Sequence, residues 1–225
     1  MRKKAVVIAI DGPAASGKTT AARMLARALP ALYLDTGAMY RALAYLALRT
    51  QTDIDNENAL VRLCSRYKIR IQLDQGAALG FRIFAGDQEL GPELSSKEVT
   101  AVVSSIAAHA RVRDVMVQEQ RSIAAQGAVV MAGRDVGTVV LPDAGCKIFL
   151  TASLDARVKR RREELRGAGV DVNMHVLAQE IIERDRLDEN RASSPLSVAK
   201  DAHVIDSSDM SPEEVVGAIL RLVDR

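Results

Sequence analysis

The chain has 225 residues, of which 48% are hydrophobic and 27% are charged, and its formal net charge is +2. This balance suits one α/β domain with a sizeable core, and it excludes bulk polybasic character, so nucleic acid is not an expected partner. Aromatic residues make up only 3% of the chain and tryptophan is absent, which also argues against a base-stacking platform.

The amino-terminal segment has no pattern of a leader or a membrane anchor. Arg2, Lys3 and Lys4 precede an apolar run that Asp11 interrupts, and this run is too short for a signal sequence or a membrane span. The two cysteines lie far apart, at positions 64 and 146, and we expect small buried side chains there rather than metal ligands. We therefore expect a cytoplasmic protein without membrane contact, and a monomer, because nothing in the sequence demands an oligomer.

Short apolar runs alternate with helix-like patterns along most of the chain. Strands separated by helices are typical of a parallel sheet that is covered on both faces. We predict a single three-layer α/β domain over residues 1–225, with a parallel five-stranded sheet. Its strands are expected at Ala5–Ile10, Ala31–Leu34, Ala128–Ala132, Cys146–Leu150 and Ala202–Ile205.

The first predicted strand runs directly into a glycine-rich loop, and a helix-like stretch, Ala21–Leu29, follows the loop. Gly12 and Gly17 bracket four residues, and Lys18 and Thr19 come next, which is the P-loop spacing in its strand–loop–helix context. Backbone amides and the helix N-terminus surround phosphate oxygens in such a loop, Lys18 reaches the outer phosphates, and Thr19 holds Mg²⁺. An ordinary glycine-containing turn is the alternative. The predicted phosphate-binding residues are Gly12, Pro13, Ala14, Ala15, Ser16, Gly17, Lys18, Thr19 and Thr20.

Polar side chains follow the second and third predicted strands. Thr36 and Arg41 come after the second strand, where a hydroxyl can donate to a phosphate and a guanidinium can clamp it. Arg134 and Asp135 come directly after the third strand. Ligands of open α/β sheets gather outside the carboxyl ends of the strands, so we expect both segments near a second substrate. A structural ion pair is the alternative for Arg134 and Asp135.

The region between the second and third core strands breaks the alternation of strand and helix. Lys68–Leu73 and Phe81–Phe84 each alternate apolar and polar residues, beside the turn signals Asp74–Gly76 and Ala85–Asp87. This pattern predicts a small antiparallel hairpin or meander. We expect an insert at about residues 60–110. It covers a second substrate or is a surface feature without function, and its sequence favours neither alternative.

A basic run follows the fourth core strand on a helix-like stretch that ends near Gly167 and Gly169. Such runs are usually solvated helix faces, but in a P-loop protein arginines on a mobile segment can close over the transferred phosphoryl group. We therefore favour a helical lid at about residues 155–170. Its basic residues are Arg157, Lys159, Arg160, Arg161, Arg162 and Arg166.

Three charged residues share one face of a predicted helix near the C-terminal end. Arg184, Asp188 and Arg191 have i, i+4 and i+7 spacing, so they are neighbours on that face. A carboxylate there can hold a ribose and a guanidinium can hold a phosphate. By itself, the pattern is more typical of a solvent-exposed helix.

Taken together, these motifs resemble the bacterial cytidylate kinase family over essentially the whole chain. The P-loop is shared by many nucleotide-hydrolysing proteins, but the strings Asp35–Arg41 and Gly133–Thr138 are far more specific. Val112-Arg113 and the segment Glu183–Arg191 extend the likeness. The resemblance implies a P-loop core, a lid, an enlarged monophosphate-binding region with a small β-sheet, and γ-phosphoryl transfer from ATP to CMP or dCMP.

The resemblance also implies roles for individual residues. Thr36 and Arg41 correspond to the contacts with the acceptor phosphate, and Asp188 to the contact with the sugar hydroxyls. Cytosine contacts fall on Ser104, Arg113 and Asp135, where an arginine–aspartate pair suits the carbonyl and amino groups of the base. The catalytic residues implied are Lys18, Arg134, Arg160 and Arg191, of which Arg191 also lies beside the acceptor phosphate and sugar.

The sequence departs from the family at one place. Members commonly carry Ile-Arg before the helix that enters the cytosine site, whereas this chain reads Leu94-Ser95-Ser96. The detail of the acceptor-phosphate cradle is therefore open, but the class of reaction is not affected.

We predict an ATP-dependent kinase with Mg²⁺ as cofactor and CMP and dCMP as small-molecule partners. A GTPase-type switch is disfavoured because the sequence contains no Asn-Lys-x-Asp and no Asp-x-x-Gly motif. A kinase for another nucleoside monophosphate or a metabolite is the better rival. A nucleic-acid-binding P-loop protein is disfavoured by the near-neutral charge and the few aromatic residues.

Overall fold

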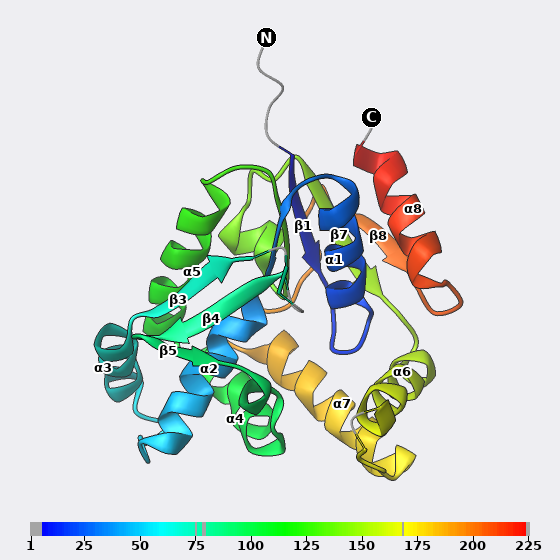
Figure 1. Ribbon diagram of the computed structural model, residues 1–225. Coiled ribbons are helices and arrows are strands. Elements are labelled where there is room, and N and C mark those ends of the chain that lie inside the picture. The colour runs from blue at the N-terminus through cyan, green and yellow to red at the C-terminus, as the bar shows by residue number, and fades with distance from the viewer. Residues whose placement is uncertain (1–5, 75, 78–79, 168, 224–225) are drawn as a thin grey trace.

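The computed structural model describes residues 6–74, 76–77, 80–167 and 169–223. Its centre is a five-stranded sheet in the order β2-β6-β1-β7-β8, in which every neighbouring pair is parallel (Figure 1). The strands are β1 (Val7–Asp11), β2 (Leu32–Asp35), β6 (Val129–Gly133), β7 (Cys146–Thr151) and β8 (His203–Asp206).

The predicted core sheet is confirmed, and each strand begins within two residues of its predicted start. The prediction began the first strand at Ala5, which lies outside the described residues. The apolar runs identified the strands because β1 and β6 are buried on both faces, so their side chains are apolar almost without interruption.

Helices cover both faces of this sheet. Their bounds are α1 (Lys18–Ala28), α2 (Thr36–Arg49), α3 (Glu57–Tyr67), α4 (Lys97–Ala108), α5 (Ala110–Ala124), α6 (Leu154–Gly167), α7 (Met174–Asn190) and α8 (Pro212–Val223), with a 3₁₀ turn, η1 (Pro92–Ser95), and a π-type turn, η2 (Val136–Val140). Side-chain caps begin several of them: Asp35 accepts from the amide of Gly37 at α2, and Ser96 from that of Val99 at α4.

The apolar core lies in two clusters on opposite faces of the sheet. The larger contains Ile8 and Ile10 of β1 together with Leu25 of α1 and Leu43 of α2. The smaller contains Met131 of β6, packed with residues of α5 and η2. Full burial of side chains of this size stabilises a fold by roughly 1.5–3 kcal/mol each, so this core holds the loops at the strand ends firmly.

The predicted antiparallel insert is present, and it is a three-stranded meander in the order β3-β4-β5. Its strands are β3 (Ile69–Leu73), β4 (Phe81–Ala85) and β5 (Gln88–Leu90), and the predicted turn Asp74–Gly76 includes Gln75, which lies outside the described residues. The meander packs on α2 and beside β2, where the rings of Tyr33 and Phe81 lie 5.8 Å apart between centroids.

Helices α6 and α7 form a pair at the end of the molecule toward which β1 points (Figure 1). They share a small apolar cluster built on Val158, Leu177 and Ile181, separate from the two clusters of the sheet. The predicted basic segment is therefore helical, and its role as a lid stays a prediction. Within the described part of the chain, no helix is long and apolar enough to cross a membrane.

The close approach at Gly12 yields a stability prediction. Gly12 has φ +148°, and a Cβ there would overlap the backbone carbonyl of Leu150, whose carbon would lie only 3.0 Å away. We expect Gly12→Ala to lower the free energy of unfolding by about 2–4 kcal/mol, measured by urea denaturation. Gly145→Ala is the matched control, because its added Cβ would meet only the Val7 carbonyl oxygen at 3.9 Å, and its effect should stay within about 0.5 kcal/mol. Equal effects of the two substitutions would contradict the clash.

Candidate active site

The loop between β1 and α1 has the geometry of a phosphate cradle. Gly12 and Gly17 have φ +148° and +90°, and Ala15 has φ +57°, so the backbone turns sharply three times before the helix begins. Gly17 is the N-cap of α1 and supplies no side-chain cap, so the first amides of this helix are left for another acceptor. The unfilled amides and the helix dipole together favour an anion at this place.

The side chain of Lys18 folds back over its own loop. Its Nζ donates to the Pro13 carbonyl oxygen at 2.5 Å and to the Ser16 hydroxyl oxygen at 3.2 Å. Burial, with the repulsion of Arg134 as a second cause, holds the pKa of Lys18 well below its usual range. An anion beside Lys18 would relieve both effects, so this cation favours a phosphate as partner.

Two cavities meet at Lys18. The first, of about 740 Å³, is lined by residues 15–21 of the loop and helix and by Arg160, Ser207 and Met210, and we call it the P-loop cavity. The second, of about 610 Å³, is lined by residues of α2, α4, α5, β6 and α7, and we call it the Asp135 cavity. Lys18, Thr19, Arg41 and Arg184 are among the residues that line both, so ligands in the two cavities would face each other across the loop.

A buried charged cluster forms the inner wall of the Asp135 cavity. Arg113 forms an ion pair with Asp135, and the second carboxylate oxygen of Asp135 lies 3.4 Å from Arg191. Arg113 also donates to the Ala107 carbonyl oxygen at 3.2 Å and lies over the ring of Tyr40. An acceptor carboxylate beside a guanidinium donor thus lines this cavity, and Ser104 of α4 lies on its wall.

Helix α7 contributes the opposite wall. Asp188 accepts a hydrogen bond at 2.7 Å from Arg134, and the nearby arginines lower the pKa of Asp188 although its burial opposes this. The predicted helix face is confirmed for Arg184 and Asp188. Arg191 is instead the C-cap, just beyond the helix, where its Nε donates to the Ser194 carbonyl oxygen at 2.6 Å.

The predicted phosphate contacts after β2 lie at the rim shared by the cavities. Arg41 is paired with Asp35 at 2.8 Å. The hydroxyl of Thr36 lines the Asp135 cavity but donates to the Ala132 carbonyl oxygen at 3.1 Å, so donation to a phosphate needs rotation of this hydroxyl. Leu94 and Ser95 of η1 line the P-loop cavity, so the departure from the family leaves an uncharged wall there.

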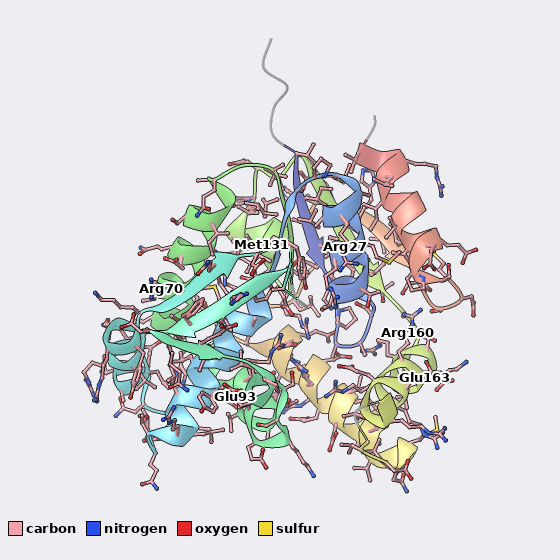
Figure 2. The ribbon with its side chains drawn as sticks, viewed as in Figure 1. Arg27, Arg70, Glu93, Met131, Arg160 and Glu163 are labelled. Carbon is pink, nitrogen blue, oxygen red and sulfur yellow. The ribbon has the colours of Figure 1, made fainter. Side chains whose placement is uncertain are left out.

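The arginines of α6 are divided between different partners. Arg160 extends from α6 toward the core and donates to Ser207 beside the P-loop (Figure 2). Arg157 forms an ion pair with Asp185 and lies 3.4 Å from the Ala14 carbonyl oxygen. Arg161 pairs with Glu164 and lines both cavities. Arg157 and Arg160 thus both lie against the P-loop, Arg157 through the Ala14 carbonyl oxygen and Arg160 through Ser207, whose hydroxyl donates to the Ser16 carbonyl oxygen at 3.1 Å.

The structure adds residues that the sequence-based assignment did not include. Arg184 is half-buried and lines both cavities, and its Nε has no partner among the described residues. Loss of solvation, together with repulsion by Arg134, lowers its pKa to about 10. The i, i+4 spacing of Arg184 and Asp188 was the sequence feature that pointed to Arg184. Asp185 accepts from the Ala14 amide at 3.2 Å, and Asp11 accepts from the amides of Val136 and Gly137. No local pattern signals these last contacts.

The fold and this site define a phosphotransferase of the P-loop class, with a glycine-rich loop and a cation-rich cavity on either side of one lysine. Residues 8–225 match the family model for cytidylate kinase. The chain therefore belongs to the cytidylate kinase family.

Individual relatives agree with this assignment. The chain is 47% identical over 216 residues to a cytidylate kinase of Pelotomaculum thermopropionicum, covering 96% of this chain and 95% of that protein. It is 44% identical over 220 residues to a cytidylate kinase of Bacillus cereus, covering 98% of this chain and 96% of that protein. A solved structure of an uncharacterized protein from Eubacterium ventriosum matches with a TM-score of 0.53 at 14% identity, covering 98% of this chain and 99% of that one, which supports the fold alone.

The burial of Asp11 yields a pH prediction. Burial raises the pKa of Asp11 from 3.8 to about 6 against the two hydrogen bonds that it accepts. Between these pH values the folded protein binds more protons at this site than the unfolded chain, so the stabilising contribution of Asp11 is greatest at low pH and falls as the pH rises through 6. Asp11→Asn cannot titrate, and it therefore removes this dependence.

We expect the free energy of unfolding of the wild type, minus that of Asp11→Asn, to fall by up to about 3 kcal/mol between pH 4 and pH 7. Urea denaturation of both proteins across this range measures the difference, and subtraction removes the titration of all other groups. A difference that stays constant with pH would show that the pKa of Asp11 is not raised.

Proposed function

We infer that this protein transfers the γ-phosphoryl group of ATP to CMP and dCMP, giving CDP and dCDP. The observation that carries this function is the meeting of the P-loop cavity and the Asp135 cavity at Lys18. Membership of the cytidylate kinase family supports the same reaction and the same acceptor.

The donor nucleotide is assigned to the P-loop cavity. Its phosphates take the amides of residues 12–20, and Lys18 leaves the Pro13 carbonyl to pair with the outer phosphates. Thr19 is exposed at the first turn of α1 and lines both cavities, so its hydroxyl is placed to share a Mg²⁺ ion with phosphate oxygens. When bound, Mg²⁺ neutralises charge on the phosphates that are being separated.

The acceptor nucleotide is assigned to the Asp135 cavity. Asp135 accepts from the cytosine amino group, while Arg113 and Ser104 donate to the base. Asp188 holds the sugar hydroxyls. Arg41, Thr36 and Arg191 hold the acceptor phosphate, so the ion pairs that Arg41 and Arg191 make with carboxylates are exchanged for phosphate contacts.

Positioning and charge neutralisation account for most of the catalysis, because phosphoryl transfer needs little covalent chemistry from the protein. Arg134 forms an ion pair with Asp188, and its charge also acts on Lys18. A cation at this place stabilises the charge that spreads over the transferred group. Residues 155–170 act as the lid, with Arg160 as the arginine placed on the donor side. Lid closure excludes water and thereby suppresses hydrolysis of ATP.

We place the reaction in the cytoplasm, because its substrates are the metabolites ATP and CMP, and we propose that the protein acts as a monomer, because both cavities are lined by one chain. Residues 60–110 form the monophosphate-binding region of the single domain, since α4 contributes Ser104 to the Asp135 cavity and Arg113 follows directly in α5.

A kinase for a different nucleoside monophosphate is the rival function. Uracil presents a carbonyl where cytosine presents an amino group, and a carboxylate repels that carbonyl. Asp135 therefore favours cytosine over uracil.

A coupled assay of ATP consumption with CMP, UMP, AMP and GMP tests this function. We expect turnover of CMP to exceed that of the other three by at least about tenfold in kcat/KM, because uracil offers no amino group to Asp135 and the larger purines place their donors and acceptors differently. A repeat with dCMP tests the deoxynucleotide. Turnover of AMP or GMP without turnover of CMP would overturn the proposal.

Two substitutions separate the donor site from the acceptor site. Lys18→Ala should lower kcat by about a thousandfold or more while the Kd for CMP, measured by calorimetry, changes less than about threefold. Asp135→Ala should lower kcat/KM for CMP by about a hundredfold while the KM for ATP changes less than about threefold.

Asp201→Ala is the control for loss of a carboxylate, because Asp201 pairs with Lys147 outside both cavities. Activity of Lys18→Ala within several-fold of the wild type would refute the donor-site assignment. Equal losses toward CMP and ATP in Asp135→Ala would instead assign Asp135 a structural role.

A further inference from the structure

Asp11 is a buried carboxylate at the centre of the molecule that the proposed catalysis does not use. It is the last residue of β1, and its neighbours in the sheet are Gly133 of β6 and Phe149 of β7. Only 4% of its surface is exposed, and it is not among the described residues that line the two cavities. A ligand is therefore not its direct partner.

Both oxygens of Asp11 bind one short stretch of backbone. Oδ1 accepts from the Val136 amide and Oδ2 from the Gly137 amide, each at 2.7 Å. A Cβ on Gly137 would lie 3.3 Å from Oδ2, so the backbone approaches the carboxylate as closely as a glycine permits. Two charge-assisted hydrogen bonds on consecutive amides fix both the position and the orientation of this stretch.

A carboxylate at this position carries a cost. No described cation forms an ion pair with it, and the charge of Lys18 is only the weakest of the influences on its pKa, while Asp135 repels it. An uncharged side chain would avoid this cost, so the carboxylate has a function that offsets it. The two amides that it holds are the evidence for what that function is.

The stretch held by Asp11 follows directly on the residues that face the acceptor. Arg134 and Asp135 immediately precede Val136, and Asp135 is the N-cap of η2 without a side-chain cap of its own. On the other side, Asp11 immediately precedes Gly12, the first residue of the P-loop. One side chain thus joins the start of the donor loop to the segment that carries Asp135.

We propose that Asp11 is a positioning residue that fixes Asp135 relative to the P-loop and so contributes to the preference for cytosine. This inference rests on the proposed function and deepens it. A shift of about 1 Å in a positioned group can cost about a hundredfold in rate, so loss of either hydrogen bond is expected to be measurable.

Asp11→Asn is the first test, because it keeps the shape but turns an amide NH₂ toward one of the two backbone donors. We expect the KM for CMP to rise at least about tenfold and the ratio of kcat/KM for CMP over UMP to fall at least about tenfold. The KM for ATP should change less than about twofold, because the amides of the P-loop are not partners of Asp11.

Val129→Ala is the matched control for a purely structural effect. Val129 is fully buried at the start of β6, the opposite end of the strand from Gly133. It should lower stability without changing either KM or the CMP to UMP ratio. If Asp11→Asn behaves in the same way, with less stability but an unchanged ratio, the proposal is overturned.

The pH profile gives an independent readout. Because burial and Asp135 raise the pKa of Asp11 to about 6, its protonation weakens one of the two acceptors within an accessible range. The groups facing it are Lys18 on α1 and Asp135 before η2, and the Lys147 stem from β7 packs on Gly137. The wild-type ratio of CMP over UMP should fall between about pH 7.5 and 5.5, whereas that of Asp11→Asn should stay flat. The phosphates of both substrates titrate alike and cancel in the ratio, so parallel profiles of the two proteins would contradict the role of Asp11.

Hydrogen exchange makes the test independent of turnover. In Asp11→Asn, the amides of a peptide spanning residues 134–138 should exchange faster than in the wild type, while those of β6 should not. If Asp11→Asn does not fold, Gly137→Ala perturbs the same contact from the other side, with the same expected fall in the CMP ratio. A wild type without CMP turnover would refute the proposed function alone, and unchanged exchange at residues 134–138 would refute the role of Asp11.

Discussion

Repulsion between buried cations is the constraint on which the rest of this structure depends. Lys18 and Arg184 are both disfavoured by the nearby charge of Arg134, and burial together with this charge lowers the pKa values of both. Arg134 itself is favoured as a cation, because the Asp188 carboxylate raises its pKa against the effect of burial. The nearby carboxylates compensate only part of this, since Arg184 makes no ion pair among the described residues. Nucleotide phosphates supply the missing negative charge. Stability is thus sacrificed for affinity toward polyphosphates.

The parallel sheet makes this concentration of charge possible. Consecutive parallel strands end at one edge, so loops that are distant in sequence converge there without a long path through the core. Gly12, Asp35 and Arg134 each follow the end of a core strand or close it, and the apolar clusters on both sheet faces prevent these ends from separating. The buried strands, and not the loops, therefore supply the stability that offsets the repulsion between these like charges.

Local chemistry explains why the sequence predicted so much of this arrangement. The P-loop and the five core strands are encoded in contiguous residues, so spacing and hydropathy were sufficient. The family resemblance implied a shared site for Arg113 and Asp135, but their ion pair is seen only in the structure. The third strand of the insert was missed because Gln88–Leu90 is too short to show alternation. Asp11 and Asp185 were missed because their partners are 125 or more residues away, and no local pattern encodes such contacts. The hydrogen bond that the Thr36 hydroxyl donates to the Ala132 carbonyl of β6 is likewise visible only in the structure.

The contact between Asp185 and the Ala14 amide has a consequence for nucleotide binding. This carboxylate accepts from the donor loop while it also pairs with Arg157 of α6, so a side chain of the protein occupies an amide of the kind that phosphates use. A phosphate that binds the Ala14 amide must compete with the Asp185 carboxylate. When the phosphate binds, the contact between the loop and α7 weakens and so, through Arg157, does the contact with α6. Occupation of the loop and release of the helix pair are therefore linked equilibria. By reciprocity, any contact that draws α6 and α7 away from the loop tightens the binding of the nucleotide by the same factor.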